Sequence, residues 1–285
     1  MPTATTRLTG VIGHPIRHSL SPVIFNAAYQ ALALDWTYLA FDVAPGAAPA
    51  AVAAMRALGI GGYSVTMPHK EAVAGCCDRL DGDAALLGAV NCLVPDADGT
   101  VVGHSTDGAG FVWSLATELG FHPKGRRVAV LGAGGAARSV VLALAGAGAR
   151  EVVVVNRSPQ RAEAAAMLAG DVGRVGGEAD IQHADLVVNS TPLGMAGVAP
   201  GELAISDPST LGPGQIVADL IYHPARTPLL DLAERRGATP LGGLGMLVGQ
   251  AAVAFRHFTG IDAPAAVMLE AARAALDART AQPAS

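Results

Sequence analysis

The strongest constraint on the fold of this 285-residue chain is a glycine-rich turn between an apolar strand and a helix. Residues 127–131 read RVAVL, which is typical of a strand buried on both faces. The next residues, Gly132-Ala133-Gly134-Gly135-Ala136-Ala137, match the pattern G-x-G-x-x-A, and a helix is predicted over 136–145. Such glycines let the backbone approach closely, so that N–H groups at the helix start can bind a pyrophosphate. The position between strand and helix therefore predicts a dinucleotide-binding unit.

Strands and helices alternate on both sides of this turn. Downstream, the alternation is typical of a doubly wound parallel sheet. Its predicted elements are strands over 151–155, 186–189 and 216–219 and a helix over 160–168. Upstream, a second α/β unit is predicted from strands over 8–13, 37–43, 60–66, 90–94 and 100–103 and helices over 23–34 and 47–58. Further helices are expected over 108–119, 246–258 and 264–279. At roughly 150 residues per domain, the length also predicts about two domains.

Composition excludes several classes of protein. With 19 basic and 24 acidic residues, the net charge is −5 and no basic run occurs, which argues against nucleic acid as a partner. The uncharged run 237–255 contains Pro240 and several glycines, so it predicts a loop and a buried helix rather than a membrane span. No signal peptide is evident, and the three cysteines fit neither a disulfide framework nor a CxxC site. We therefore expect a cytoplasmic protein with free thiols.

The residues after the second strand of the dinucleotide unit indicate which nucleotide binds. An acidic residue that would bind a ribose 2′-hydroxyl is expected there, but Asn156-Arg157-Ser158 stands in its place. An amide, a guanidinium and a hydroxyl, with Arg161 one helical turn further, suit a 2′-phosphate. The alternative is an ordinary solvated arginine pair. We predict NADP rather than NAD.

Polar residues also follow the strands of the N-terminal half. Ser19 and Ser21 precede a predicted helix, where Ser21 is expected either to cap the helix, with Pro22 as first helical residue, or to bind a carboxylate together with Ser19. Lys70 is one of only two lysines in the chain and follows a rigid Met-Pro turn. If the fold brings Lys70 and Asp107 together, they form a pair that can handle a proton.

The histidines do not predict a metal site. His14 and His18 are four residues apart, but Pro15 disfavours a helix there and no carboxylate accompanies them as in HExxH. We expect these two side chains to have structural or surface roles, with no bound metal.

Nine ordered blocks between about residues 8 and 275 resemble the signatures of the shikimate dehydrogenase (shikimate/quinate dehydrogenase) family. They are residues 13–16 with 18–22 (GHPI, HSLSP), 65–70 (VTMPHK), 88–91 (GAVN), 106–107 (TD), 132–136 (GAGGA), 156–158 (NRS), 189–195 (NSTPLGM), 219–222 (DLIY) and 245–250 (GMLVGQ). The resemblance implies an N-terminal α/β substrate domain formed by 1–107 and 244–285. It also implies a Rossmann-type, doubly wound parallel-sheet NADP domain over 108–243, with the active site in the cleft between them.

Residue roles follow from the same resemblance. It implies that Lys70 is the catalytic acid/base and Asp107 its partner. The substrate-binding residues would be Ser19, Ser21, Thr66, Lys70, Asn91, Asp107, Tyr222 and Gln250. The NADP-binding residues would be Gly132, Ala133, Gly134, Gly135, Ala136, Asn156, Arg157, Ser158, Arg161, Thr191, Leu220 and Gly243.

The implied activity is reversible NADP-dependent reduction of 3-dehydroshikimate to shikimate, in the pathway to chorismate and the aromatic amino acids, by a monomer or homodimer. Ser64 and Ser105 stand where the family often has asparagine, which leaves open a preference for quinate or an amino analogue. The Ser19-Leu20-Ser21 pair and the lack of an acid at 156–158 favour shikimate with NADP. An alternative of another class is a non-catalytic NADP-sensing regulator, for which the blocks around Lys70 and Asp107 would be superfluous.

Overall fold

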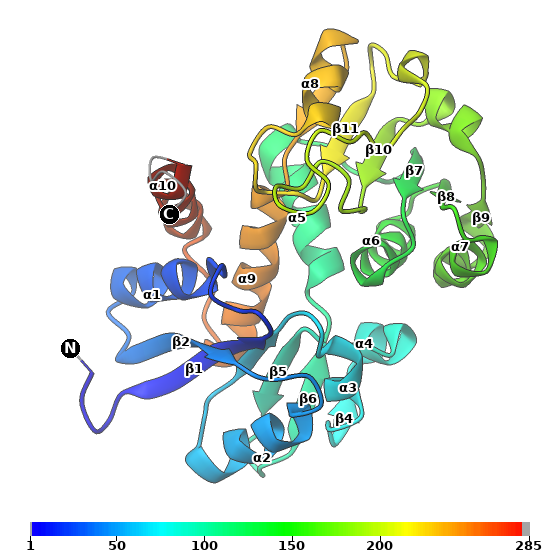
Figure 1. The fold of residues 1–285 in the computed structure, drawn as a ribbon. Coiled ribbons are helices and arrows are strands. Elements are labelled where there is room, and N and C mark those ends of the chain that lie inside the picture. Colours follow the sequence, from blue (N-terminus) through cyan, green and yellow to red (C-terminus); the bar gives the residue numbers. More distant parts are fainter. Residues whose placement is uncertain (1, 281–285) are drawn as a thin grey trace. The chain divides into compact units, whose positions relative to one another are not determined.

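The computed structural model describes residues 2–280, which divide into two compact units. The first comprises the chain up to Thr106 together with the residues from Val248 onward, and the second is Asp107–Leu247. Within the described residues, each unit contains a six-stranded sheet (Figure 1). No helix within 2–280 is long and apolar enough to cross a membrane.

The sheet of the first unit has the order β2-β1-β3-β5-β6-β4. Its strands are Arg7–Gly13 (β1), Trp36–Asp42 (β2), Tyr63–Val65 (β3), Arg79–Leu80 (β4), Cys92–Pro95 (β5) and Val101–His104 (β6). β1 is parallel to β2 and β3, whereas β5 is antiparallel to β3 and β6. The strand predicted over 60–66 is shorter than expected. Gly62 has a φ of +158° and lies against Phe258, so a side chain would not fit before β3.

Helices cover both faces of this sheet. They are Ser21–Ala31 (α1), Ala48–Leu58 (α2), Lys70–Ala74 (α3), Gly82–Leu87 (α4), the part of Leu244–Thr259 (α9) from Val248 onward, and Ala265–Thr280 (α10). On one face, Phe25 of α1 stacks on Tyr38 of β2 at 4.2 Å between ring centroids, and Phe255 of α9 packs against Phe25 and Tyr29. On the other, Val52 and Met55 of α2 pack with Ile12 and Val65.

The sheet of the second unit has the order β12-β11-β10-β7-β8-β9, and all its strands are parallel. The strands are Arg127–Leu131 (β7), Glu151–Val155 (β8), Gly173–Val175 (β9), Leu186–Asn189 (β10), Ile216–Asp219 (β11) and Thr239–Leu241 (β12). This is the strand order of a Rossmann fold, with the reversal between β7 and β10. The predicted doubly wound parallel sheet is confirmed.

The edge strands β9 and β12 were not predicted. The loop expected at the start of the uncharged run 237–255 is partly wrong, because β12 lies within it. Pro240 argues against a central strand, but an edge strand can contain proline because one side of its backbone needs no partner.

Helices also cover both faces of the second sheet. They are Asp107–Leu119 (α5), Gly135–Gly146 (α6), Pro159–Ala166 (α7) and Pro228–Arg235 (α8), with short 3₁₀ helices at Met167–Val172 (η1), Glu178–His183 (η2) and Pro208–Thr210 (η3). Leu115, Val140 and Val152 belong to one core cluster, and Val187, Leu229 and Leu232 to the other. No helix was predicted over 228–235, although Thr227 caps the first turn of α8: its hydroxyl accepts a bond from the Leu230 N–H.

Candidate functional site

Polar residues of the first unit collect at one edge of its sheet. The parallel strands β1 and β3 both end there, the antiparallel β5 begins there, and β6 ends there. Ser19 and Ser21 therefore follow β1, Thr66 and Lys70 follow β3, and Asn91 immediately precedes β5. The structure thus brings most of the predicted substrate residues of this unit to a single edge.

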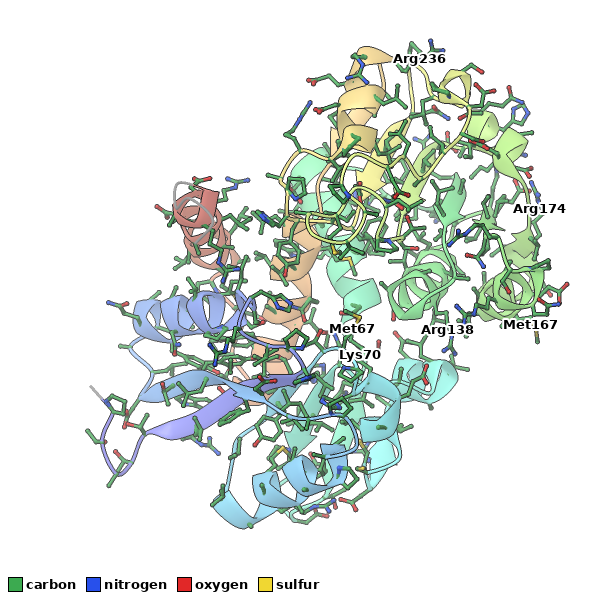
Figure 2. All side chains as sticks on the ribbon, viewed as in Figure 1. Met67, Lys70, Arg138, Met167, Arg174 and Arg236 are labelled. Atoms are coloured by element: carbon green, nitrogen blue, oxygen red, sulfur yellow. The ribbon has the colours of Figure 1, made fainter. Side chains whose placement is uncertain are left out.

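Backbone hydrogen bonds hold the Lys70 and Asn91 segments together. The Val90 N–H donates to the Lys70 carbonyl at 2.9 Å, and the Val65 N–H donates to the Asn91 carbonyl at 2.8 Å. Lys70 is half-buried and is the first residue of α3, and it comes three residues after the exposed Met67 (Figure 2). The neighbouring His69 is buried, and its Nε2 is hydrogen-bonded to the Val43 carbonyl oxygen at 2.7 Å. Lys70 therefore projects from a segment that is fixed on both sides.

Asn91 and Thr106 form a buried reciprocal pair. The Thr106 N–H donates to Asn91 Oδ1 at 2.7 Å, and Asn91 Nδ2 donates to Thr106 Oγ1 at 3.0 Å. Asp107 follows Thr106 directly and is 9% exposed. The two hydrogen bonds therefore orient the Asn91 amide. They also fix the backbone of Thr106, from which Asp107 follows.

Ser21 does not cap α1, so that expectation was wrong. Leu20 occupies the cap position without a side-chain bond, and Ser21 is already the first helical residue. The Ser19 hydroxyl instead accepts a bond from the Ser21 N–H at 3.2 Å. The Ser21 hydroxyl is therefore not used as a helix cap. Its predicted binding role requires that it is not.

Two buried hydroxyls lie behind this edge. Tyr38 Oη and Ser64 Oγ have no hydrogen-bond partner within the described part of the chain. Burial raises the pKa of Tyr38 well above its usual value, and the nearby Ser64 hydroxyl opposes this shift only in part. Ser64 is 7% exposed, the same fraction as the predicted substrate residue Ser21, so its burial alone does not separate it from the predicted site.

The two other predicted substrate residues lie on different elements. Gln250 is half-buried on α9, within the first unit. Tyr222 is half-buried and belongs to the second unit, where it comes three residues after the end of β11.

The glycine-rich turn of the second unit has the conformation that its pattern predicts. Gly132 has a φ of +103°, and a Cβ there would lie 2.7 Å from Ser190 Oγ, so only glycine fits. Gly134 occupies the cap position of α6 and has no side chain to satisfy the first N–H groups of the helix. A Cβ on Gly134 or Gly135 would meet nothing within 4 Å, so the backbone at the helix start is open. An anion can bind to such a helix start.

The end of β8 lies beside this turn, because the Gly132 N–H donates to the Val155 carbonyl at 2.9 Å. The Asn156 amide donates to the Ser158 carbonyl at 3.0 Å and shapes the turn into α7. Arg157 and Arg161 are exposed, and no carboxylate occurs between them. The predicted cofactor residues of this region are therefore together, and their charge suits a phosphorylated ribose.

A buried polar network at the ends of β10 and β11 was not assigned a role from the sequence. The Asn189 amide donates to Asp219 Oδ1 at 3.0 Å, and the Thr227 hydroxyl donates to Asp219 Oδ2 at 2.7 Å. Burial raises the pKa of Asp219, while the bonds from Thr227, Ile221 and Asn189 oppose this shift. The sequence signal is a polar residue that ends each apolar strand, in LVVN and IVAD.

This network fixes predicted cofactor residues. Thr191 donates to Asn189 Oδ1 from its hydroxyl at 2.7 Å and from its N–H at 3.0 Å. The Ile221 N–H donates to Asp219 Oδ1 at 3.1 Å, which orients the segment that contains Leu220. A Cβ on Gly243 would lie 2.2 Å from the Leu220 carbonyl oxygen, so Gly243 is required where these two segments meet.

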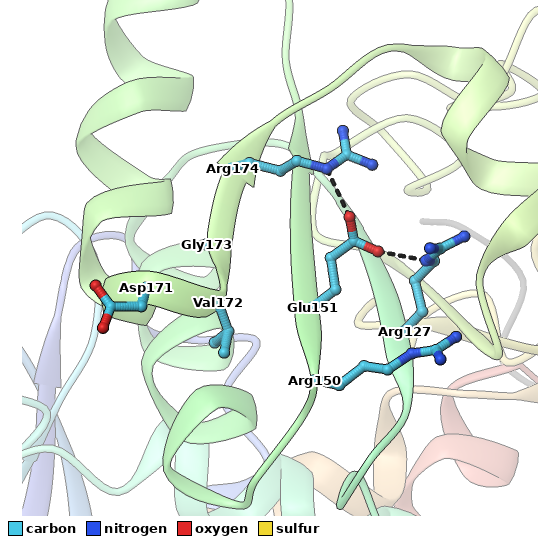
Figure 3. Close-up of a pocket in the computed structure, with 7 residues that line it drawn as sticks. All are labelled: Arg127, Arg150, Glu151, Asp171, Val172, Gly173 and Arg174. Atoms are coloured by element: carbon cyan, nitrogen blue, oxygen red, sulfur yellow. Dashed lines mark hydrogen bonds and ion pairs between the residues drawn. The ribbon is translucent and has the colours of Figure 1, made fainter.

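A pocket of about 380 Å³ lies at the opposite edge of the same sheet, where β7, β8 and β9 begin (Figure 3). Arg127 and Arg174 both pair with Glu151, and Arg174 also pairs with Asp180 at 2.6 Å. The carboxylates of Glu151, Asp171 and Asp180 balance the charges of Arg127, Arg150 and Arg174. This electroneutral cluster links the first residues of neighbouring strands. It lies at the start of β7, whereas the glycine-rich turn follows the end of β7.

The histidines that raised the question of a metal make other contacts. His14 Nδ1 lies 2.7 Å from Asp42 Oδ1, and the His18 carbonyl accepts a bond from Arg279 at 2.7 Å. Among the residues with described positions, no group of three or more His, Cys, Asp or Glu could hold a metal ion. Cys76, Cys77 and Cys92 are free thiols.

The second unit is thus an α/β dinucleotide-binding fold, and the first presents a polar sheet edge built around a lysine. Family models match in three segments: the shikimate dehydrogenase substrate binding domain over 11–93, shikimate / quinate 5-dehydrogenase over 114–194, and the shikimate 5′-dehydrogenase C-terminal domain over 243–273. The chain is 47% identical over 283 residues to the shikimate dehydrogenase (NADP(+)) of Methanopyrus kandleri, covering 94% of this chain and 95% of that protein. The chain belongs to the shikimate dehydrogenase family.

Solved structures agree with this assignment. A shikimate dehydrogenase in complex with NADP+ superimposes with a TM-score of 0.91 at 37% identity, covering 97% of this chain and 98% of the other. A quinate dehydrogenase from Corynebacterium glutamicum in complex with NAD superimposes with a TM-score of 0.86 at 31% identity, covering 94% and 99%.

Proposed function

We propose that this protein catalyses the reversible, NADP-dependent reduction of 3-dehydroshikimate to shikimate, on the route to chorismate and the aromatic amino acids. The observation that carries the proposal is the collection of Thr66, Lys70 and Asn91 at one sheet edge, in a chain that also contains a Rossmann unit. A hydroxyl, an ammonium and an amide suit a polyol whose ketone takes up a proton during reduction.

We assign the substrate to residues 1–107 and 244–285 and NADP to 108–243. When bound, NADPH supplies the hydride. Lys70 holds the proton that the reduced oxygen receives, and Asp107 keeps the ammonium charged and directed at that oxygen. In the reverse direction the lysine accepts the proton from the alcohol.

The remaining roles divide by the chemistry of the side chains. Ser19, Ser21 and Tyr222 donate hydrogen bonds to the substrate carboxylate, and Thr66, Asn91 and Gln250 bind its ring hydroxyls. Gly132, Ala133, Gly134, Gly135 and Ala136 hold the pyrophosphate. Asn156, Arg157, Ser158 and Arg161 would hold the phosphorylated ribose. Leu220 and Gly243 would lie near the nicotinamide end, and Thr191 would also contact the cofactor.

A second candidate is a quinate-type activity of the same family. It is favoured by Ser64 and Ser105, where shorter hydroxyls replace the amides that the family often has, and by the likeness to a quinate dehydrogenase. The buried Ser64 and Tyr38 hydroxyls have no hydrogen-bond partner within the described residues, so a longer polar side chain at position 64 would change the contacts available there.

The test is an assay of purified protein with shikimate or quinate and with NADP or NAD, followed by the absorbance of the reduced nucleotide. We expect turnover with shikimate and NADP. Brisk turnover with quinate and none with shikimate would transfer the assignment to the second candidate. Binding of NADP without turnover of any polyol would instead indicate a non-catalytic sensor.

Location and assembly belong to the same proposal. We propose a cytoplasmic protein, in keeping with its three free thiols, that acts as a monomer or homodimer on a small-molecule substrate without a nucleic-acid partner. Fractionation and light scattering test these two statements.

A further inference from the structure

A stacked pair of histidine rings joins two elements of the first unit. His104 ends β6 and His257 lies near the end of α9, and their ring centroids are 4.1 Å apart with an angle of 26° between the planes. The side chain of His104 is 16% exposed, whereas His257 lies at the surface. The outer ring therefore covers the inner one.

A carboxylate fixes the inner ring from another side. Asp81 Oδ2 lies 2.6 Å from His104 Nδ1, while Asp81 Oδ1 accepts the bond from the Ala84 N–H that caps α4. The Asp81 N–H in turn donates to the Gly103 carbonyl at 2.9 Å. His104 is thus held by an anchored anion at its edge and by an aromatic ring on its face.

Both elements joined by this pair carry residues that we assign to substrate binding. The His104 carbonyl accepts a bond from the Asn91 N–H at 3.0 Å, and Thr106, the buried partner of the Asn91 amide, follows two residues later. On α9, Gln250 precedes His257 by seven residues, which places both side chains on the same face of the helix. The ring stack therefore fixes the face that carries Gln250 relative to the strand end that holds Asn91.

We propose that His104 and His257 are positioning residues for the substrate, and that the loss of their stacking in acid weakens substrate binding while leaving the binding of NADP unchanged. The inference rests on the proposed function.

The direction of the pH effect follows from the charges around the rings. Burial and the neighbouring His104, together with Arg256, lower the pKa of His257, and Asp81 opposes this shift. Cys92 pairs with His104 in the sheet, and Asp83 lies two residues after Asp81 in the first turn of α4. Because the folded state favours the neutral form of His257, the stack is intact above the ordinary histidine pKa of about 6.5 and is opposed as the pH falls below it.

The test compares KM for shikimate, KM for NADP and kcat between pH 5.5 and 8.5, a range in which the shikimate carboxylate stays ionised. In the wild type, KM for shikimate should rise by about three- to tenfold toward the acid end, the size expected for the loss of one ring contact. His257→Phe keeps a stacking ring without a titrating group, so this rise should disappear. His257→Ala should raise KM for shikimate by about three- to tenfold even at pH 8, with kcat and KM for NADP within about twofold.

His122→Phe is the matched control, because His122 is an exposed histidine of the second unit, and it should behave as wild type at every pH. An unchanged acid rise in His257→Phe, or equal changes in KM for shikimate and NADP in His257→Ala, would overturn the inference. So would a lowered melting temperature in His257→Ala without a change in KM. A wild type that does not turn over shikimate would refute the proposed function itself, a result that is distinct from all of these.

Discussion

We propose that Arg157 contributes most to the choice between NADP and NAD. It is exposed, follows the end of β8 and has no ion pair within the described residues. A guanidinium in this position can make charge-assisted hydrogen bonds to a 2′-phosphate, whereas the 2′-hydroxyl of NAD offers it no charge.

We expect Arg157→Ala to raise KM for NADP by about ten- to a hundredfold and to change KM for NAD little, because such a bond contributes roughly 1.5–3 kcal/mol. Steady-state kinetics with both nucleotides measure this. Arg150→Ala is the control, since Arg150 is an exposed arginine at the opposite end of β8. Equal changes for the two nucleotides would mean that Arg157 has only a structural role.

We propose that Lys70 and Asp107 carry the chemical step of the reaction. Replacing either by alanine should lower kcat by about 10²–10⁴, with modest effects on substrate affinity. The double variant should be little worse than the worse single one, because residues that act as a unit are not additive. Single-turnover kinetics measure these losses, and fully additive losses would show that the two residues act separately.

At the scale of elements, the turn from β7 into α6 combines two requirements on one residue. The backbone at Gly132 has a positive φ, which glycine adopts without strain. A Cβ at this position would also clash with the Ser190 side chain. Gly146, at the other end of α6, meets neither requirement, because a Cβ there would contact nothing within 4 Å.

We therefore expect opposite effects of the same substitution at the two ends of α6. Gly132→Ala should lower the free energy of unfolding by about 1–3 kcal/mol and weaken NADP binding. Gly146→Ala should raise the free energy of unfolding by about 0.5–1 kcal/mol, since alanine is the better helix former. Urea unfolding followed by circular dichroism measures both, and a neutral Gly132→Ala would contradict the steric argument.

The sequence predicted those elements whose pattern is local. Long apolar runs marked β7, β8 and β10, and the glycine pattern marked the start of α6, because each signal is complete within a few residues. The three-residue strands β9 and β12 could not be predicted, since they exist only through pairing with β8 and β11. Of the two roles expected for Ser21, capping of α1 is the one that is wrong. The choice between Leu20 and Ser21 as cap depends on how the preceding loop enters the helix.

The candidate site divides in the same way. Lys70, Asn91 and the glycine-rich turn lie in motifs with a chemical signature of their own. The hydrogen bonds among Asn189, Asp219 and Thr227 connect residues up to 38 positions apart. No local pattern in the sequence predicts them. The stacked rings of His104 and His257 are 153 positions apart and carry no local signal.

For the whole molecule, the response of stability to acid combines two opposite contributions. Ion pairs and hydrogen bonds lower the pKa of carboxyls such as Asp180, where Arg174 is the largest cause. A carboxyl with a lowered pKa stabilises the fold above its unfolded pKa, and this stabilisation is lost as the pH falls through the folded value. Asp219 makes the opposite contribution to stability, because burial raises its pKa and the folded state favours its protonated form.

Asp219→Asn should therefore gain stability relative to the wild type as the pH rises from about 3.5 to 7, because the amide keeps the shape of the network without a buried charge. Asp180→Asn should show the reverse trend and serves as the control for sign. Chemical unfolding at several pH values gives both differences. A difference between Asp219→Asn and wild type that does not change with pH would contradict the burial argument.

The antiparallel course of β5 and β6 has a practical consequence. Asn91 enters β5 and Thr106 leaves β6 at the same edge, so the turn at 96–100 that joins the two strands lies at the far end of the hairpin, roughly 14 Å away by the rise of four strand residues. Residues 97–99 are exposed there, and Gly99 has a φ of +87° with no neighbour within 4 Å of a Cβ. A fluorescent label or an affinity peptide inserted into this turn would report on the protein, or immobilise it, while its reactive edge stays clear.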